Sequence, residues 1–471
     1  MSTLPQSRPL TPQSNQKMFA PGESRLNLAR LRVLDKLIKS RWPLLLARSI
    51  TLAGFVFTIL VGLLGSPVGS HNFAIIFVWI AWWTALKLFF IPLGGRSWCS
   101  VCPLPMPGEW LQNGSLLTKA QKSIGLGMRW PRRLRGNWLA SGLFLLIGIF
   151  SALTLTDARL TAWILLGLLG TAMLLSLIFE RRAFCSYVCP IGGFTGIYAK
   201  TAPLEVRVID SDICKSHAEK TCYTHCPWGV YPLAMRDSSQ CGLCMECLRV
   251  CTYDNISLNL RPFGSDLGQT NSITRLDETL LALVMLSSAL SFSAVFIGPW
   301  GWLKSAAYDV GSTAWWAYTG AYLALSLLVL PGLYTLAVWW SQKTGQAKAP
   351  FKRLLADYSQ ALLPLGLFTW IAFTIDFAFP KFSYVLQVLS DPFGWGWNLV
   401  GTSGVSLPSA LLGAAPVLQV GAVVVGLFWS ANLSQRLVAK QVQPARARRA
   451  ILPLAGFSLL FSLTMLLLLL G

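Results

Sequence analysis

Residues 214–251 read CKSHAEKTCYTHCPWGVYPLAMRDSSQCGLCMECLRVC. The cysteines of this run stand in two groups, Cys214-x7-Cys222-x3-Cys226-Pro227 and Cys241-x2-Cys244-x2-Cys247-x3-Cys251. In a C-x2-C-x2-C segment, three thiolates lie on a loop wound tightly enough to take three corners of one iron-sulfur cubane, and a cysteine beyond the loop ligates a second cluster. We therefore interpret the run as a ferredoxin-like α+β insert for two clusters with crossed ligands.

One of the two ligand sets is complete. Crossed ligation assigns Cys241, Cys244, Cys247 and Cys226 to one cluster, which predicts a [4Fe-4S] centre. Structural zinc prefers two separated cysteine pairs, often with histidine, and the spacings of this run fit that pattern poorly.

The second set is one thiolate short. It consists of Cys214, Cys222 and Cys251, because His217 stands where a second cysteine of the first group would be. Three ligands favour a [3Fe-4S] centre, and the spacings before Cys-Pro resemble those of seven-iron ferredoxins. In the alternative, a [4Fe-4S] cluster takes His217 as its fourth ligand, since imidazole can replace thiolate on iron. Glu219 is a weaker candidate for that position, and we favour a His217 that is not a ligand.

The composition of the whole chain indicates a polytopic membrane protein. Its 471 residues are 54% hydrophobic and 12% charged, and they include 20 Trp. Apolar stretches long enough to cross a hydrocarbon core of ~30 Å predict about nine membrane helices and a mainly α fold. They occur near residues 43–64, 71–92, 137–156, 160–180, 277–298, 315–340, 359–379, 414–433 and 450–471.

These stretches divide the chain into four expected parts. They are a basic cytoplasmic tail with an interfacial helix (1–42), a four-helix membrane domain (43–180), the ferredoxin-type insert (181–265) and a five-helix membrane domain (266–471). The interfacial helix is expected within residues 23–42, where Leu and Ile residues form an apolar stripe beside Arg and Lys.

The distribution of Lys and Arg predicts the orientation in the membrane. Positive charges gather in the first 42 residues, in the loop after the second apolar stretch and at Arg181 and Arg182, and such segments accumulate on the cytoplasmic side. We expect a prokaryotic cytoplasmic membrane protein with its N-terminus and clusters inside and its C-terminus outside. The reducing cytoplasm argues against disulfides. Topology also accounts for the net charge of +20, so no nucleic-acid partner is expected.

Four further cysteines stand at the ends of two apolar stretches. They belong to the motifs SWCSVCP (97–103) and FCSYVCP (184–190), which contain Cys99, Cys102, Cys185 and Cys189. If the two helices are neighbours, four thiols meet at the membrane surface. Such a quartet suits a mononuclear iron, a [2Fe-2S] cluster, Cu(I) or a dithiol-disulfide pair. The alternative is two unrelated thiol pairs with packing roles.

These two motifs, with PIGGF (190–194) leading into the insert, resemble the NosR/NapH/CcoG group of polytopic iron-sulfur proteins. The resemblance covers about residues 43–260 and implies a redox role and the same membrane architecture. The group includes maturation or electron-supply factors for nitrous oxide reductase, periplasmic nitrate reductase and cytochrome oxidase. The first motif departs from the group, because it is C-x2-C-P where C-x3-C-P is usual.

The few histidines limit how electrons can cross the membrane. The chain contains His71, His217 and His225, of which the last two lie in the insert, so a bis-His haem within the membrane is excluded. A transmembrane path therefore needs quinone or a partner subunit. Lys87, in the inner part of the second apolar stretch, is expected to extend toward the cytoplasm.

The leading hypothesis is a membrane-bound iron-sulfur protein that relays electrons between a cytoplasmic or quinone donor and a partner redox complex. We expect an electron-transfer subunit rather than a stand-alone enzyme, and no catalytic residues. Basic residues of the insert are expected to dock an acidic redox partner; they are Lys200, Arg207, Lys215, Lys220, Arg236 and Arg249. The alternatives are a copper or metalloenzyme maturation factor that uses the Cys-Pro motifs, and a cluster-containing sensor or transport subunit.

Overall fold

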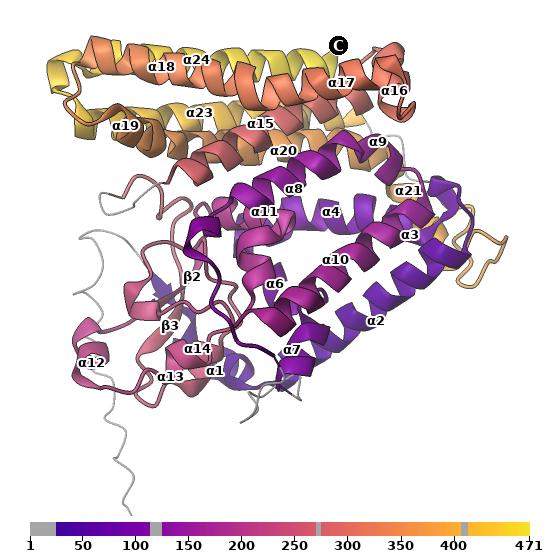
Figure 1. Cartoon of the computed structure of the whole chain (residues 1–471), viewed down its shortest axis with the longest axis horizontal. Coiled ribbons are helices and arrows are strands. Elements are labelled where there is room, and N and C mark those ends of the chain that lie inside the picture. The colour runs from indigo at the N-terminus through magenta and orange to yellow at the C-terminus, as the bar shows by residue number, and fades with distance from the viewer. Residues whose placement is uncertain (1–24, 114–124, 270–274, 407–412) are drawn as a thin grey trace, which may run out of the picture.

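The computed structural model describes residues 25–113, 125–269, 275–406 and 413–471. Within these ranges, eight helices are long and apolar enough to cross a membrane, and the strands form one small sheet. The mainly α, multi-pass membrane fold predicted from the composition is confirmed. Figure 1 shows two packed groups of helices, with the sheet and its short helices beside the N-terminal group.

The N-terminal group contains three of the eight candidate spans, and in it α2 packs against α10. The second of these spans, Phe73–Gly94, is interrupted by π-helical segments at Ile76–Trp82 and Leu86–Phe90. The helices of this group are α2 (Trp42–Leu64), α3 (Phe73–Ile75), α4 (Trp83–Ala85), α5 (Ile91–Gly94), α6 (Trp98–Val101), α7 (Met106–Asn113), α8 (Trp138–Ile149), α9 (Ser151–Thr154), α10 (Ala158–Ile178) and α11 (Pro190–Tyr198).

The apolar stretch 137–156 is not one long helix. It forms α8, which has 12 residues, and then the short α9 after a break at Phe150. The expected number of about nine membrane helices therefore includes one that is shorter than a full crossing. Hydropathy measures only the apolar content of a stretch, and so it does not reveal a break in the helix.

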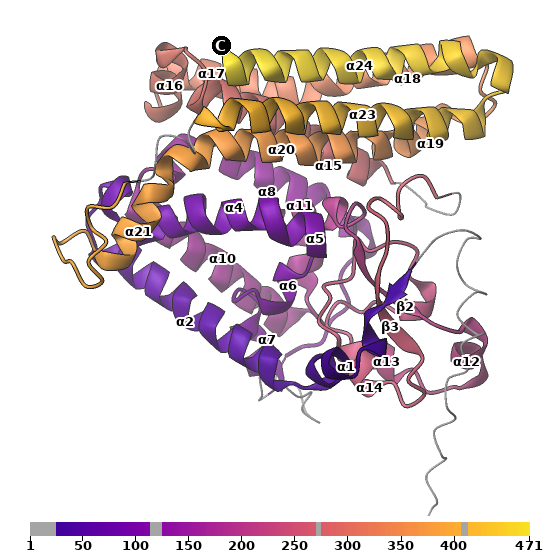
Figure 2. The same ribbon diagram turned by 180° about the vertical axis from the view of Figure 1, so that it is seen from behind.

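The C-terminal group contains the other five candidate spans, which lie nearly side by side in Figures 1 and 2. The central helix α15 contacts α8, α18, α20 and α24. Because it is enclosed, it carries much of the main hydrophobic core. The helices of this group are α15 (Leu276–Phe296), α16 (Gly301–Tyr308), α17 (Thr313–Ala324), α18 (Leu330–Gly345), α19 (Phe351–Tyr358), α20 (Leu362–Ala378), α23 (Ala415–Gln441) and α24 (Pro444–Leu470). After α20, α21 (Phe382–Ser390) turns onto the N-terminal group and packs against α3 and the π-helical segment Ile76–Trp82.

The insert is built on an antiparallel sheet with the strand order β1-β3-β2. Strands β2 (Leu204–Val208) and β3 (Ile256–Leu260) pair with Val206 opposite Leu258, and both of these side chains are buried. The chain between the two strands carries the cysteine run and three short helices, α12 (Ser211–Ser216), α13 (Thr221–Thr224) and α14 (Glu246–Val250).

The N-terminal tail docks on this insert. Residues Leu26–Asn27 form β1, which pairs with β3, a 3-10 turn follows at Leu28–Arg30, and the α-helix α1 spans Arg32–Lys39. Leu28 and Ile38 pack against the core of the insert. The expected helix across residues 23–42 is therefore shorter, because the start of this segment fills the free edge of β3, where backbone hydrogen bonds are available.

Lys87 is fully buried and does not extend toward the membrane surface, so that expectation is wrong. Its ammonium lies 5.1, 4.9 and 5.2 Å from the ring centroids of Trp83, Trp370 and Phe373. Among the described residues, Nζ has no hydrogen-bond partner. The cause is α20, which packs against the second span and covers Lys87 with aromatic rings.

Candidate metal centres

The four cysteines of the complete set line one small apolar cavity of about 30 Å³. Its other walls come from Val206, Trp228, Val230, Pro232, Met235, Gly242 and Met245. The C-x2-C-x2-C loop is wound by two left-handed residues, Leu243 at φ 51° and Met245 at φ 61°. Such strained conformations persist where the surroundings enforce them, often at ligand sites. They bring Cys241, Cys244 and Cys247 of the loop to the same cavity.

The four cysteines of this cavity would repel one another as thiolates, and positively charged metal ions would relieve that repulsion. Burial raises the pKa of Cys247 well above its ordinary value, and the charges of the other three thiolates raise it further. Burial also raises the pKa of Cys244 to about 12. Four neighbouring thiolates repel one another, and iron stabilises them in the deprotonated form that binds metal. The backbone N–H of Val230 points at Cys226 Sγ across 3.3 Å. These residues fit a [4Fe-4S] cluster.

The structure also brings the three cysteines of the second set together. Burial raises the pKa of Cys222, and the charges of Cys251 and Cys214 raise it further. Asn255 contacts two of the three sulfurs, because its Nδ2 lies 3.3 Å from Cys214 Sγ and its backbone N lies 3.4 Å from Cys251 Sγ. Asn255 was absent from the residues expected from the sequence. The only signal for it is its place four residues after Cys251.

His217 is engaged elsewhere. Its half-buried ring stacks on Tyr253 with 4.6 Å between centroids, and Nδ1 donates a 2.6 Å hydrogen bond to the carbonyl of Glu219. That bond occupies Nδ1 and leaves Nε2 as the nitrogen that could bind iron, an arrangement common in metal-ligating histidines. The three-cysteine set and the set that includes His217 therefore both stay predictions.

The quartet from the two Cys-Pro motifs also converges. Cys99 lies on α6, and Cys189 caps the N-terminus of α11, where its Sγ accepts a 3.3 Å hydrogen bond from the N–H of Gly192. Burial raises the pKa of Cys185, and the charges of the other three thiols raise it further. The interpretation as two separate thiol pairs is therefore disfavoured.

Different helix types accommodate the unequal spacing of the two motifs. Cys185 lies in the π-helical turn Phe184–Val188, in which the N–H of Cys189 donates to the carbonyl of Phe184, five residues earlier, across 2.8 Å. Cys99 lies in the tighter α6. A π-helical turn contains one more residue than an α-helical turn. The cysteines of the C-x3-C and C-x2-C motifs can therefore lie at the same site.

Arg182 joins the quartet to the complete set. Its side chain is 1% exposed, and it forms a two-point ion pair with Glu109 on α7. It also donates to the carbonyl of Cys99 across 2.5 Å, and its guanidinium lies 4.3 Å from the ring centroid of Trp228. In the sequence, Arg182 indicated only membrane topology.

Arg96 makes a second connection. Its two terminal nitrogens donate to the carbonyls of Ser239, across 2.9 Å, and of Cys185, across 3.0 Å. Ser239 precedes Cys241, and so a single side chain holds both cysteine-bearing loops. Neither arginine was among the site residues expected from the sequence, because their partners lie far away along the chain.

A buried ion network supports the complete set from the sheet. Arg261 contacts Glu205 at 2.8 Å and Asp266 at 2.5 Å, and all three side chains are fully buried. Asp266 also accepts the N–H of Ser238 across 2.8 Å, and this fixes the loop before Cys241. The network includes Arg207.

Several of the basic residues expected to dock a partner are therefore not available on the surface. Arg207 is buried in this network, and Lys200 is buried in ion pairs with Glu278 and Asp237. The side chain of Arg249 is 7% exposed and pairs with Glu246. The positive charge of a residue in the sequence does not reveal whether its side chain is buried in an ion pair or exposed for docking.

No group of three or more His, Cys, Asp or Glu side chains in the described ranges is arranged to hold a metal ion. A cluster differs from a single ion, because irons and sulfides stand between the protein thiolates. The structure therefore gives no support to a mononuclear centre at any of the three cysteine groups.

Comparison with known families defines the class of protein. A family model described as a 4Fe-4S binding domain matches residues 75–125 and 161–207. Each segment contains one of the two Cys-Pro motifs, whereas the run 214–251 lies outside both. With its candidate spans, the chain is a multi-pass membrane protein with a ferredoxin-type iron-sulfur domain.

Individual relatives agree with this class. The chain is similar to the methylamine utilization ferredoxin-type protein MauN of Paracoccus denitrificans, with 29% identity over 156 residues, 30% of this chain and 52% of MauN. MauN of Methylorubrum extorquens is 29% identical over 27% of this chain and 47% of its own length. The ferredoxin-type protein NapH of Haemophilus influenzae is 27% identical over 35% of this chain and 63% of NapH.

The similarity to NapH confirms the resemblance inferred from the motifs. The chain spans about half the length of the MauN proteins that it matches. No solved structure matches it.

Proposed function

We propose that the chain is a membrane electron-transfer protein in which the three cysteine groups each hold an iron-sulfur cluster. Bound clusters supply one-electron transfer. The observation that carries the proposal is the position of Arg182, which contacts the quartet through Cys99 and the complete set through Trp228. Its positive charge also acts on the thiolates of Cys185 and Cys244, and so one buried cation stabilises both groups.

The ligands follow the three groups of thiols. Cys226, Cys241, Cys244 and Cys247 would hold a [4Fe-4S] cluster. The second set, Cys214, Cys222 and Cys251, would hold a [3Fe-4S] cluster, because it supplies three thiolates. The contacts of Asn255 with the sulfurs of Cys214 and Cys251 support this grouping. Lys220 donates to the carbonyl of Cys214 across 2.7 Å and places a cation beside this set.

For the quartet we propose an iron-sulfur cluster rather than copper. The 4Fe-4S family model covers all four of its cysteines. A three-coordinate copper(I) site is not favoured either, because the described residues show no group of three or more ligands arranged for a metal ion. The maturation-factor hypothesis, which depends on copper here, is therefore the less favoured one.

The side of the membrane and the partners belong to the same proposal. The clusters and the N-terminus would face the cytoplasm, and electrons would pass between a soluble or quinone donor and a partner redox complex. The buried ion pairs of Lys200 and Arg207 leave exposed Lys215 as a residue for docking an acidic partner.

Iron content and EPR of the purified chain test the proposal. Three clusters with a four-iron quartet site predict about eleven irons per chain, and a two-iron quartet site about nine. The oxidised protein should show the near-isotropic signal of [3Fe-4S]. Replacing the quartet cysteines with serine should lower the iron content and leave this signal unchanged.

Two outcomes would contradict the proposal. About seven irons per chain, unchanged by the serine variant, would leave the quartet without a cluster. Binding of Cu(I) that the serine variant abolishes would favour the maturation factor instead.

A further inference from the structure

A polar cavity of about 300 Å³ lies between the quartet and the complete set. Its walls include Arg96, Arg135, Arg275, Glu278, Tyr187 and Trp228. Ser186, next to Cys185, and Gln240, next to Cys241, also line it, so both cysteine groups border the cavity. Arg135, Gly136 and Asn137 directly precede α8, and Arg275 directly precedes α15, so the cavity lies beside the starts of these two helices.

The cavity carries an excess of positive charge. Glu278 is already paired with Lys200 at 2.6 Å, and Arg275 is paired with Asp277 at 2.8 Å. Lys200 also pairs with Asp237. Arg275 also lies 4.0 Å from Glu278. With Arg96 and Arg135, four cations stand against three carboxylates, so one net positive charge is left. Arg96 is bonded only to carbonyls in the described ranges, and its Nε is buried without an acceptor.

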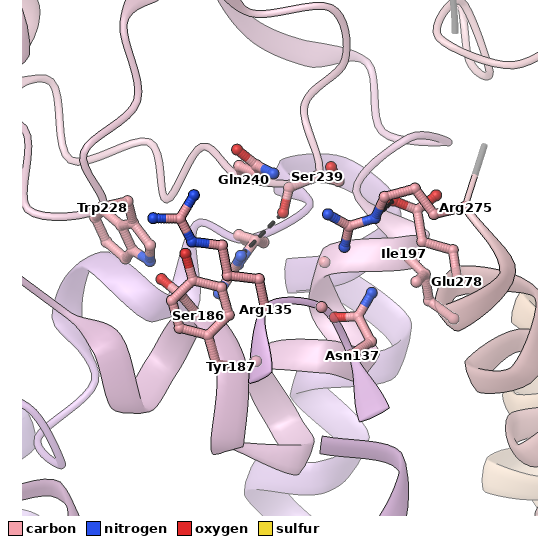
Figure 3. A pocket seen from close by; sticks show the side chains of 14 residues that line it. Arg135, Asn137, Ser186, Tyr187, Ile197, Trp228, Ser239, Gln240, Arg275 and Glu278 are labelled. Carbon is pink, nitrogen blue, oxygen red and sulfur yellow. Dashed lines mark hydrogen bonds and ion pairs between the residues drawn. The ribbon is translucent and has the colours of Figure 1, made fainter. Parts of the chain in front are cut away.

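Arg135 stands out because it forms no ion pair in the described part of the chain. Figure 3 shows its guanidinium reaching into the cavity from the side opposite to that of Arg275. Gly192 and Gly196 also line the cavity, and an added Cβ would lie 3.4 and 3.7 Å from the terminal nitrogens of Arg96, so both glycines leave room for this guanidinium. The three arginines that line the cavity come from separate segments of the chain.

We propose that this cavity binds a phosphate-bearing anion between Arg135 and Arg275, with Arg96 at its base. Guanidinium forks match phosphate oxygens, and a tetrahedral phosphate presents its oxygens in more directions than a planar carboxylate does. The volume is at the small end for ligand pockets. It suits a phosphate monoester or the headgroup of an anionic lipid whose chains remain in the bilayer.

If the proposed function holds, such an anion would also act on the clusters. Negative charge beside the quartet and the complete set disfavours their reduction. We therefore expect the ligand to lower the reduction potential of the neighbouring clusters. This consequence rests on the proposed function, whereas binding of the anion does not.

The test uses the full chain in nanodiscs of phosphatidylcholine. Calorimetric titration with glycerol 3-phosphate, and with inorganic phosphate, should show saturable binding if the source is a free anion. In a second arm, nanodiscs that contain phosphatidic acid are washed, and lipid that remains bound is quantified by native mass spectrometry. Retained phosphatidic acid, without binding of the soluble phosphates, would identify a lipid headgroup as the source.

Variants locate the site. Arg135→Gln and Arg275→Gln should each weaken binding by about tenfold or more, as expected for loss of charge-assisted hydrogen bonds. Arg133→Gln is the matched control, because Arg133 is exposed in the same loop and does not line the cavity. It should leave binding unchanged.

Binding in neither arm would overturn the inference, as would an equal loss in Arg133→Gln and Arg135→Gln. An unchanged visible absorbance of the clusters shows that a variant is folded. The quartet serine variant separates this inference from the proposed function, since it should still bind the anion after losing iron.

Discussion

At the scale of single residues, the site depends on buried arginines more than on its cysteines alone. Arg182 contacts Glu109, the carbonyl of Cys99 and the ring of Trp228. Removing one partner of a buried ion pair leaves the other charge without compensation, which costs about 3–5 kcal/mol. We expect Arg182→Gln to destabilise the protein by this amount and to lower its iron content, as measured by thermal unfolding and iron assay.

The chain offers a matched surface pair as the control. Arg129 lies 3.9 Å from Glu180, and its side chain is 86% exposed. Exposed pairs contribute about 0–1 kcal/mol, so Arg129→Gln should change the melting temperature little. Equal effects of the two variants would contradict the role assigned to Arg182.

Glu109 makes the same ion pair sensitive to acid. Burial acts to raise the pKa of Glu109, but the charge and hydrogen bonds of Arg182, with help from Arg48, outweigh it and hold the pKa below its ordinary value. A carboxyl group whose pKa is lowered by folding stabilises the fold above its unfolded pKa. That contribution is lost as the pH falls through the lowered value.

Glu109→Gln should therefore be less stable than the original chain near neutral pH. The difference should shrink as the pH falls below about 4.3, the ordinary pKa of a glutamate, and through the lowered pKa of Glu109. Melting temperatures of the two proteins across this range test the prediction. A difference that does not depend on pH would show that the carboxylate charge is not the source of the stabilisation.

At the scale of elements, the junction between the π-helical turn and α11 sets the geometry of the quartet. A Cβ on Gly192 would lie 2.4 Å from the carbonyl oxygen of Cys185, which belongs to the backbone and cannot move away easily. Gly192→Ala should destabilise the protein by about 1–3 kcal/mol, as overpacking does. It should also lower the iron held by the quartet.

Gly167→Ala is the control for this prediction. Gly167 lies within α10, and nothing in the described structure is within 4 Å of its added Cβ. Alanine favours a helix more than glycine does, so this variant should keep its iron and its stability. Loss of iron in both variants would indicate a general effect of membrane-helix substitutions.

At the scale of the whole molecule, the insert and the C-terminus lie at opposite ends of the helices (Figures 1 and 2). With the basic N-terminal segments inside, this arrangement predicts a C-terminus outside. Alkaline phosphatase fused after Gly471 should be active, and green fluorescent protein fused before Met1 should be fluorescent. The reverse pattern would invert the proposed orientation and place the clusters outside.

Local patterns of the sequence were sufficient for the class of protein. Apolar stretches predicted the helices because membrane crossing depends on composition over about 20 residues. The spacing of Cys241, Cys244 and Cys247 predicted a cluster loop because ligands a few residues apart are placed by the local backbone. The same rule for cysteine spacing assigned Cys226 to this cluster and Cys214, Cys222 and Cys251 to a second one. The roles of these cysteines as ligands stay predictions.

Only the tertiary structure decided what surrounds these cysteines. In the tertiary structure, Arg182 lies beside Glu109, and aromatic rings surround Lys87. The N-terminal tail pairs with β3, and residues from several segments form the basic cavity. The structure also showed that Lys200 and Arg207 are buried rather than exposed. The physical reason is that each of these features joins residues distant along the chain. The type of a residue is the same whichever partner it meets in the folded chain, and so the sequence does not reveal that partner.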